Sequence, residues 1–530
     1  MLHTPTSRRG MVTAPHHLAA RAGLRVLEDG GNAIEAMIAA ASTIAAVYPH
    51  MNGLGGDNFW LIHTPGGDVT GIDACGAAAA NADISFYKNR GFAEIPSRGP
   101  LAALTVAGAV SGWQDALQFS ADAWGGQLPL ERLLEDAIYY AGKGVAVTQT
   151  LANNIHLKRP EMDQAPGFGE TFLIDGREPV RGQLFQQPRL AETLRRLAQG
   201  GLDSFYRGDL ARTLTADLER AGSPLTGDDL ARHRALRVRP LTLQVAGHQV
   251  YNMPPPTQGL ASLMLLGIYE RLGITDADGY DFIHGLVEAT KRAFRIRDSA
   301  ITDPAYMSNP AQTYLTGDLL DSLARDIRQD LALPWPEASA RGDTVWLGAV
   351  DGQGRAVSFI QSIYWEFGSG TVLQDSGIAW QNRGVSFSLD DRHHNCLKPH
   401  RRPFHTIQPA LARLADGRVM PYGTMGGEGQ PQTQAMIFAR HVLHGQELQQ
   451  AITQPRWLLG RTWGAESTSL KMESRFDATL TDQLRAAGHV VEMTGPFDEV
   501  MGHAGALVHH PDGLIEGAAD PRGDGLVAGF

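Results

Sequence analysis

The chain has 530 residues, of which 43% are hydrophobic and 19% charged, so it can bury a large core and is not globally disordered. Its formal net charge of −11 argues against a nucleic-acid partner, although a local pocket of opposite sign can still bind a small anion. Two cysteines exclude a disulfide framework and a cysteine-based metal cluster.

The N-terminal region predicts two helices separated by a glycine turn. Residues 18–27 have helical periodicity. Asn32 and Glu35 have the spacing of a capping box, which predicts the start of a second helix that ends at Pro49. This second helix is rich in alanine and almost free of polar residues on every side, so we expect it to be buried between layers of the fold.

Neither membrane insertion nor secretion is expected. The longest apolar stretch, residues 36–48, contains Ser42 and Thr43 and is too short to span a bilayer. No apolar segment of the secretory type follows the charges near the first residues. We therefore expect a cytoplasmic protein with no membrane partner.

The middle of the chain predicts four helices and a strand. The helical segments, with apolar residues at the i, i+3, i+4 spacing, are residues 128–140, 188–198, 209–220 and 280–297. Residues 241–251 alternate between apolar and polar in the manner of a strand. The sequence contains no internal repeat and no heptad pattern.

A connector and two strands open the last part of the chain. Residues 331–343 hold two prolines and many small residues without a period, which indicates an exposed connector. Strands 344–350 and 356–362 follow around a glycine turn. Beyond them the sequence predicts strands 419–423, 489–493 and 505–509, and helices 432–443 and 478–487. Strands and helices in both halves predict an α/β sandwich with helical elaborations.

Thr344 begins the first of these strands directly after the connector. A threonine hydroxyl is a poor nucleophile without an adjacent base, and the α-amine of an N-terminal threonine, with a pKa of about 8, can be that base. A cut before Thr344 creates this terminus: its Oγ attacks the carbonyl carbon of Asp343, and water hydrolyses the resulting ester into chains 1–343 and 344–530. On its own, however, a Gly-Asp-Thr sequence at a strand start is more often an ordinary turn.

Several motifs carry a resemblance to a known family. They are residues 30–36, 53–57, 367–370, 423–427 and 519–525, together with Thr344 and the Ala-Val-Asp sequence at 349–351. Each is weak alone, because loops carry most glycines, but all occur in the family's order. From residue 11 to residue 530 the chain resembles the γ-glutamyltranspeptidase family of N-terminal-nucleophile hydrolases.

The resemblance implies a fold and a two-chain organisation. The family fold is a four-layer αββα sandwich. It is built by a large chain, here residues 1–343, and a small chain, here residues 344–530, which intertwine in one domain. We therefore expect a heterodimer of the two cleaved chains, with further dimerisation possible.

The resemblance also implies a catalytic set. Thr344 stands at the family's nucleophile, and Ser362 stands at a second hydroxyl that positions it, where the family has threonine. Gly426 and Gly427 stand at the two amides of the oxyanion hole, which stabilise a negative oxygen. Without the resemblance these glycines indicate only a strand-to-helix turn. The implied chemistry needs no metal and no cofactor.

The chain departs from the family pattern where the glutamyl group binds. The arginine that binds the α-carboxylate is replaced by Cys75, for which a small core residue is the simpler interpretation. The other departures are Val345 after the nucleophile, Tyr364 for an asparagine, Arg383 for a glutamine, Ser386 for an acidic residue, and His405-Thr406 for a serine pair. Without an acidic partner the α-ammonium group would be buried unpaired, which argues against γ-glutamyl compounds as main substrates.

The replacements suggest another substrate class. Arg383, Tyr364, His405 and Thr406 are donors suited to a carboxylate without a neighbouring ammonium group, although Arg383 could instead form a surface or lid salt bridge. We expect hydrolysis of a small anionic amide. Within the family the chain is most similar to members that split oxamate into oxalate and ammonia in purine breakdown. The alternatives are a γ-glutamyl hydrolase or transpeptidase with a rebuilt site, and a non-catalytic binding protein.

Overall fold

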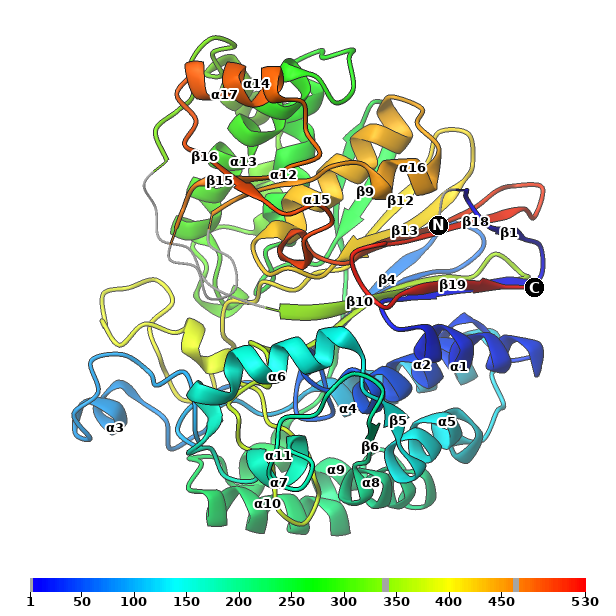
Figure 1. Cartoon of the computed structure of the whole chain (residues 1–530), viewed down its shortest axis with the longest axis vertical. Helices are drawn as coiled ribbons and strands as arrows, with labels where there is room; N and C mark the ends of the chain where they lie inside the picture. Colours follow the sequence, from blue (N-terminus) through cyan, green and yellow to red (C-terminus); the bar gives the residue numbers. More distant parts are fainter. Residues whose placement is uncertain (1–2, 336–342, 461–466) are drawn as a thin grey trace.

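Two seven-stranded antiparallel sheets lie face to face at the centre of the computed structural model, which describes residues 3–335, 343–460 and 467–530 (Figure 1). The first sheet contains, in spatial order, β1 (Thr6–Ser7), β18 (Ile515–Ala519), β17 (Ala504–His509), β13 (Val419–Thr424), β12 (Ala410–Arg413), β9 (His248–Asn252) and β8 (Leu241–Val245). The second contains β19 (Leu526–Gly529), β2 (Gly10–Ala14), β10 (Asp343–Asp351), β11 (Ala356–Tyr364), β3 (Asp57–His63), β4 (Val69–Ala74) and β7 (Leu236–Val238). Apolar side chains such as Phe59, Trp346 and Leu507 fill the space between them.

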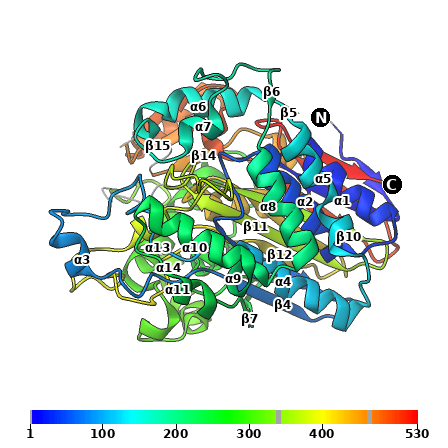
Figure 2. The same ribbon diagram turned by 90° about the horizontal axis from the view of Figure 1, so that it is seen from below.

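Helices cover the outer side of the second sheet. The longer ones are α1 (His17–Glu28), α2 (Ala33–Val47), α4 (Ala109–Phe119), α5 (Leu130–Lys143), α6 (Gln149–Met162), α8 (Pro188–Gly200) and α10 (Asp209–Ala221). Short elements complete this side: α3 (Ile84–Lys88), α7 (Phe168–Phe172), α9 (Ser204–Arg207), α11 (Gly227–Arg232), and the pair β5 (Val145–Ala146) and β6 (Leu184–Phe185). Helices α1, α2, α5 and α8 pack successively against one another, as the view in Figure 2 shows.

A second group of helices covers the outer side of the first sheet. It comprises α12 (Gly259–Glu270), α13 (Tyr280–Ala300), α14 (Gly317–Arg325), α15 (Gly429–Phe438), α16 (Leu448–Thr453) and α17 (Ala478–Ala486). A small sheet of β14 (Trp457–Leu459), β15 (Leu470–Glu473) and β16 (Val491–Thr494) lies beside them. The layers follow the order helix, sheet, sheet, helix, so the predicted four-layer αββα fold is confirmed (Figure 1).

The buried helix α2 forms as the sequence predicts. Asn32 accepts hydrogen bonds from the start of the helix and Glu35 caps in return. Every residue of α2 is buried. Gly23 lets α1 pack closely against α2, because a Cβ at position 23 would lie only 3.0 Å from the carbonyl oxygen of Ala36. Asp351, at the end of β10, accepts a hydrogen bond from the first amide of α2 and thereby joins this helix to the central sheet.

Two predicted elements differ from the structure. Residues 241–251 form the hairpin β8–β9 rather than one strand, because Ala246 and Gly247 both have positive φ, as a tight two-residue turn requires. The predicted helix 432–443 begins earlier, at Gly429, and its last turn, Ala439–Leu443, is a π-helix. Most of the predicted connector, residues 336–342, lies outside the described residues.

Each sheet contains strands from both sides of Thr344. In the second sheet β10 and β11 lie between β2 and β3, and in the first sheet β12 pairs with β9.

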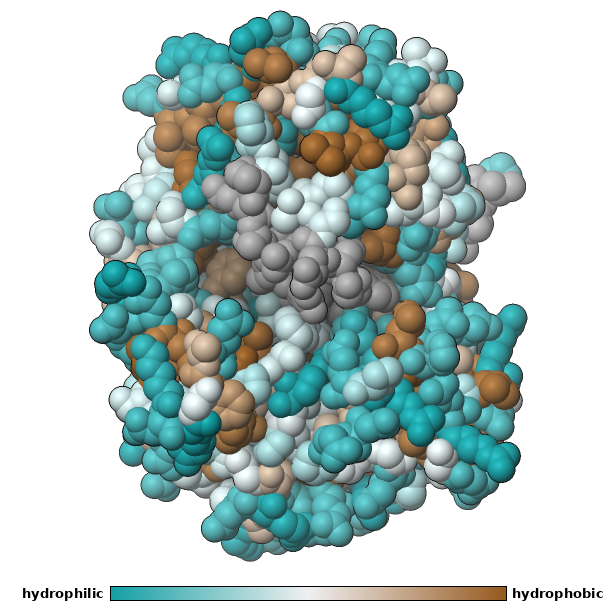
Figure 3. All heavy atoms as spheres, turned by 60° about the vertical axis from the view of Figure 1, so that its left-hand side comes forward, coloured by the Kyte–Doolittle hydropathy of each residue, from teal (hydrophilic) through white to brown (hydrophobic). Residues whose placement is uncertain are grey.

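The surface in Figure 3 is mainly hydrophilic, with small separate groups of apolar side chains. Within the described ranges, none of the helices combines the length and apolar character needed to cross a bilayer.

Candidate active site

Thr344 and Ser362 lie opposite each other on the neighbouring strands β10 and β11. Strand pairing is irregular here, so that Thr344 faces both Ser362 and Ile363 across a β-bulge. Both hydroxyl-bearing side chains are buried. The Oγ of Ser362 accepts a hydrogen bond of 2.8 Å from the amide of Tyr364. The structure therefore brings the two predicted hydroxyl residues together across the strand pair.

Trp346 joins the Thr344 strand to the opposite sheet. Its indole nitrogen donates to Ser358 Oγ at 3.0 Å. Its ring occupies space that only glycine leaves open: a Cβ on Gly423 would lie 2.3 Å from the indole, and one on Gly505 would lie 2.6 Å from it. Since Gly423 belongs to β13, this contact fixes the end of β13 relative to Thr344.

Gly426 and Gly427 form the turn between β13 and α15. Their φ angles are +113° and +52°, and the first of these strongly favours glycine. Gln258 Nε2 donates to the carbonyl oxygen of Gly427 at 2.8 Å and to that of Thr406 at 2.6 Å. Arg297 holds Gln258 in place by donating to its Oε1 at 3.0 Å. Gln258 thus connects the glycine turn to the segment that carries Thr406.

Arg383, Tyr364 and Thr406 form a buried group that we call the Arg383 cluster. Arg383 lies in the short helix Arg383–Ser386 and has no exposed surface. Its Nη2 donates to Thr406 Oγ1 at 3.0 Å and its Nη1 to the carbonyl oxygen of Phe404 at 3.3 Å. The guanidinium carbon lies 3.4 Å from the centre of the Tyr364 ring. The alternative of a surface salt bridge for Arg383 is therefore wrong.

The Arg383 cluster holds a positive charge that is incompletely paired. Among the described residues, Nε of Arg383 has no hydrogen-bond partner. Burial lowers the pKa of Arg383 to about 10, so the side chain stays charged near neutral pH. A buried cation with a free donor is suited to bind an anion.

His405, Asp57 and Cys75 form a second group, the Asp57 cluster, next to the first. His405 Nε2 lies 3.0 Å from Asp57 Oδ2. The other carboxylate oxygen of Asp57 accepts three hydrogen bonds, from the amides of Gly76 and Gly108 at 3.0 Å and from Gln381 Nε2 at 3.1 Å. One potential ligand atom from each of Asp57, Cys75 and His405 lies within 4.8 Å of the other two.

Burial dominates the electrostatics of the Asp57 cluster. Burial raises the pKa of Asp57 to about 7, although its three hydrogen bonds and the nearby Arg383 oppose the shift. Burial and Arg383 lower the pKa of His405 well below its usual value, so its imidazole is neutral at neutral pH. Cys75 has a raised thiol pKa, again chiefly because it is buried. It is a buried residue, as the sequence suggests, but it lies among ionisable groups.

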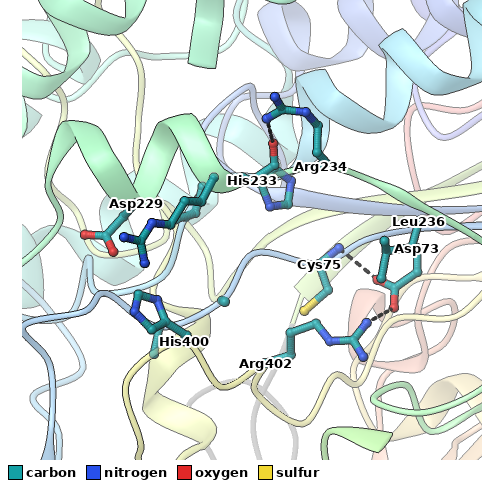
Figure 4. Close-up of a pocket in the computed structure, with 12 residues that line it drawn as sticks. Asp73, Cys75, Asp229, His233, Arg234, Leu236, His400 and Arg402 are labelled. Atoms are coloured by element: carbon teal, nitrogen blue, oxygen red, sulfur yellow. Dashed lines mark hydrogen bonds and ion pairs between the residues drawn. The ribbon is translucent and has the colours of Figure 1, made fainter. Parts of the chain in front are cut away.

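Cys75 is one of the residues that line a pocket of about 290 Å³ (Figure 4). Asp73, at the end of β4, accepts hydrogen bonds from the Cys75 amide at 2.9 Å and from Arg402 Nη1 at 2.6 Å. Arg232, Arg234, His233 and His400 are among the other lining residues. Cys75 therefore belongs both to the Asp57 cluster and to the wall of this pocket.

Sequence analysis missed two of the residues that organise the site. Asp57 ends the motif 53–57, so the signal was present, but nothing distinguished its carboxylate from the surrounding glycines. Gln258 follows a proline-rich turn and belongs to no motif. His405, expected beside a substrate carboxylate, makes a hydrogen bond to Asp57 through Nε2.

Comparison with known proteins identifies the family. The gamma-glutamyltranspeptidase family profile matches residues 19–530. The chain belongs to this family. Family members and structural neighbours are amidohydrolases, transpeptidases and acylases of the N-terminal-nucleophile type, so this γ-glutamyltranspeptidase homologue is an enzyme that acts on amides.

Individual relatives of this γ-glutamyltranspeptidase homologue match over its whole length. The oxamate amidohydrolase proenzyme of Klebsiella pneumoniae is 56% identical over 524 residues, covering 99% of both chains. A glutathione hydrolase-like proenzyme of Bacillus subtilis is 40% identical over 523 residues, covering 98% of both. The crystal structure of cephalosporin acylase from Bacillus halodurans, 34% identical, superposes with a TM-score of 0.91 and covers 100% of this chain and 97% of that one.

Proposed function

We propose that this enzyme is a self-processing amidohydrolase that hydrolyses a small carboxylate-bearing amide, oxamate in particular, to oxalate and ammonia. The buried Arg383 cluster carries the proposal, because it offers a cation and a hydroxyl close to the strand of Thr344. The name of the relative with 56% identity supports oxamate as the substrate. A cytoplasmic location and a place in purine breakdown belong to the same proposal.

Processing would occur at the Asp343–Thr344 bond. Thr344 Oγ adds to the Asp343 carbonyl carbon, the C–N bond breaks, and the nitrogen takes a proton, which leaves an ester and a free amine. Water then hydrolyses the ester to chains 1–343 and 344–530. The irregular pairing supports this step, because it leaves Thr344 outside the regular ladder between the paired residues Asp343 and Val345. The proenzyme names of relatives support it as well.

The cleaved chains would stay together as a heterodimer. Among the described residues, five strand pairings join the two chains: β2–β10, β2–β19, β3–β11, β9–β12 and β1–β18. Separation would break these pairings and expose a buried core. Further association of heterodimers is part of the same proposal.

Turnover would use the amine that processing creates. The α-amine of Thr344 takes the proton of its own hydroxyl as Oγ attacks the amide carbonyl, and then gives that proton to the departing ammonia. Ser362 would orient the nucleophile. The amides of Gly426 and Gly427 would bind the oxyanion, at a typical gain of about 3 kcal/mol for each donor. Water hydrolyses the acyl ester and restores the hydroxyl. This scheme uses no metal and no cofactor.

The Arg383 cluster would bind the substrate carboxylate. Arg383 and Thr406 supply donors, and the ring of Tyr364 limits the space beside them. His405 would support Thr406 from behind through its bond to Asp57 rather than touch the substrate. Ser386 stands where the family binds an α-ammonium group, and its hydroxyl donates to the carbonyl oxygen of Phe404. Position 386 therefore offers no carboxylate that could pair with the α-ammonium group of an amino-acid substrate.

Steady-state rates with two substrates test this proposal. We expect the processed enzyme to release ammonia from oxamate with a kcat/KM well above that for a γ-glutamyl anilide. Faster turnover of the anilide would favour a γ-glutamyl hydrolase or transpeptidase with a rebuilt site. No turnover of either substrate by correctly cleaved protein would favour a binding protein.

A further inference from the structure

We propose that Asp57, Cys75 and His405 form a binding site for a thiophilic divalent cation, with Zn²⁺ as the matching ion. A carboxylate, a thiol and an imidazole are the three ligand types that zinc takes in proteins. All three side chains are buried, and their candidate ligand atoms lie within 4.8 Å of one another. They come from β3, from the segment after β4, and from the segment before β12, so folding alone assembles them.

The spacing fits a tetrahedral ion. With bonds of about 2.0–2.3 Å, neighbouring ligand atoms of a zinc tetrahedron lie roughly 3.3 Å apart. Asp57 Oδ2 and His405 Nε2 are 3.0 Å apart, close to that edge. The Cys75 Sγ lies within 4.8 Å of the other two ligand atoms. A small rotation of side chains would bring it to the distance that a zinc tetrahedron requires.

The surroundings of Asp57 orient it as a ligand. Three N–H donors hold its Oδ1, so Oδ2 is the oxygen that faces His405. Outer hydrogen bonds of this kind fix ligand geometry in known metal sites.

The charges also balance. A divalent cation with one thiolate and one carboxylate is neutral overall. Arg383 and Arg402 lie nearby, but each already has oxygen partners: Arg383 binds Thr406, and Arg402 binds Asp73 and Asp303. The ion would displace the protons of the Cys75 thiol and, where it is protonated, the Asp57 carboxyl. His405 would stay neutral with its ring proton on Nδ1, which leaves Nε2 free to bind.

The pocket beside Cys75 supplies an approach. Cys75 lines this pocket of about 290 Å³ while its thiol also belongs to the Asp57 cluster (Figure 4). An ion can therefore approach the thiol without passing the Arg383 cluster. The inference holds whichever amide the enzyme hydrolyses.

Cobalt binding to untagged, chelator-treated protein tests the proposal, since Co²⁺ occupies zinc sites and a Co²⁺–thiolate bond absorbs in the near ultraviolet. We expect one Co²⁺ per chain with this band, and its displacement by Zn²⁺ in calorimetry. Cys75→Ala should abolish the band and weaken Zn²⁺ affinity more than about 100-fold, because losing a residue that merely supports a ligand already costs about 10- to 100-fold.

Cys396→Ala is the matched control, because Cys396 is the other buried cysteine and contacts Arg401 instead. It should bind cobalt as the unaltered protein does. Asp57→Asn, which keeps the side-chain volume, is a second ligand variant in case Cys75→Ala does not fold. The proposal is overturned if the unaltered protein shows no thiolate band, if the band survives in Cys75→Ala, or if it disappears in Cys396→Ala.

Discussion

Replacing Arg383 with methionine should greatly reduce turnover of oxamate but change the free energy of unfolding only slightly. Burial lowers the pKa of Arg383 from its ordinary value to about 10. At ~1.4 kcal/mol per pKa unit, keeping this charge buried costs on the order of 3 kcal/mol. That cost already includes the attraction of Tyr364 and Asp57. The hydrogen bonds to Thr406 and Phe404, at about 1 kcal/mol each, offset most of what remains. Arg383→Met should therefore change the free energy of unfolding by less than about 2 kcal/mol.

The same substitution should nearly abolish turnover of oxamate. Removing one partner of a buried charge pair costs about 3–5 kcal/mol, which corresponds to a loss of roughly two to four orders of magnitude in kcat/KM. The assay is the initial rate of ammonia release over a range of oxamate concentrations, together with urea unfolding. A denaturing gel should show normal cleavage, because Arg383 takes no part in the proposed cut.

Arg392→Met is the control for this prediction, because Arg392 is exposed and pairs with Asp390 in the same part of the chain. It should leave both rate and stability almost unchanged. An Arg383→Met enzyme with unaltered kcat/KM for oxamate would refute the proposed carboxylate site. A variant whose unfolding free energy falls by much more than 2 kcal/mol would refute the stability reasoning.

Two further predictions concern Thr344 and Asp57. Thr344→Ala should abolish both cleavage and turnover, since one hydroxyl serves both steps; two bands on a denaturing gel of that variant would contradict the assignment. Asp57 has a folded-state pKa of about 7, above its unfolded value of 3.8, so the folded protein binds the extra proton between these values. The contribution of Asp57 to stability is greatest below pH 4 and falls as the pH rises to 7. Relative to the unaltered protein, Asp57→Asn should gain one to a few kcal/mol of unfolding free energy between pH 5 and pH 8, as measured by urea titration. A constant difference across that range would show that Asp57 does not titrate there.

The sequence predicts the layers of this fold well because local signals determine them. The capping box of Asn32 and Glu35 and the absence of polar residues in α2 require a buried helix, and the structure has one. The hairpin at 241–251 was missed because Ala246 is an ordinary residue in an unusual conformation, and no composition rule marks it.

Individual residues of the site were harder to predict, because their roles depend on contacts between distant segments. Arg383 and Thr406 were expected in one group, and the structure places them in hydrogen-bond contact. Asp57 and Cys75 meet His405 only because β3, β4 and the segment before β12 converge. No spacing pattern in the sequence predicts that these three residues come into contact.

Segments near the two ends of the chain are in contact, and both lie far along the sequence from Thr344. The amide of Arg9 donates to the carbonyl oxygen of Phe530 at 3.0 Å. A short peptide could therefore join them, and a circularly permuted gene could start at codon 344. Removal of the initiator methionine would then expose the threonine amine directly, so that the enzyme would mature without cutting itself.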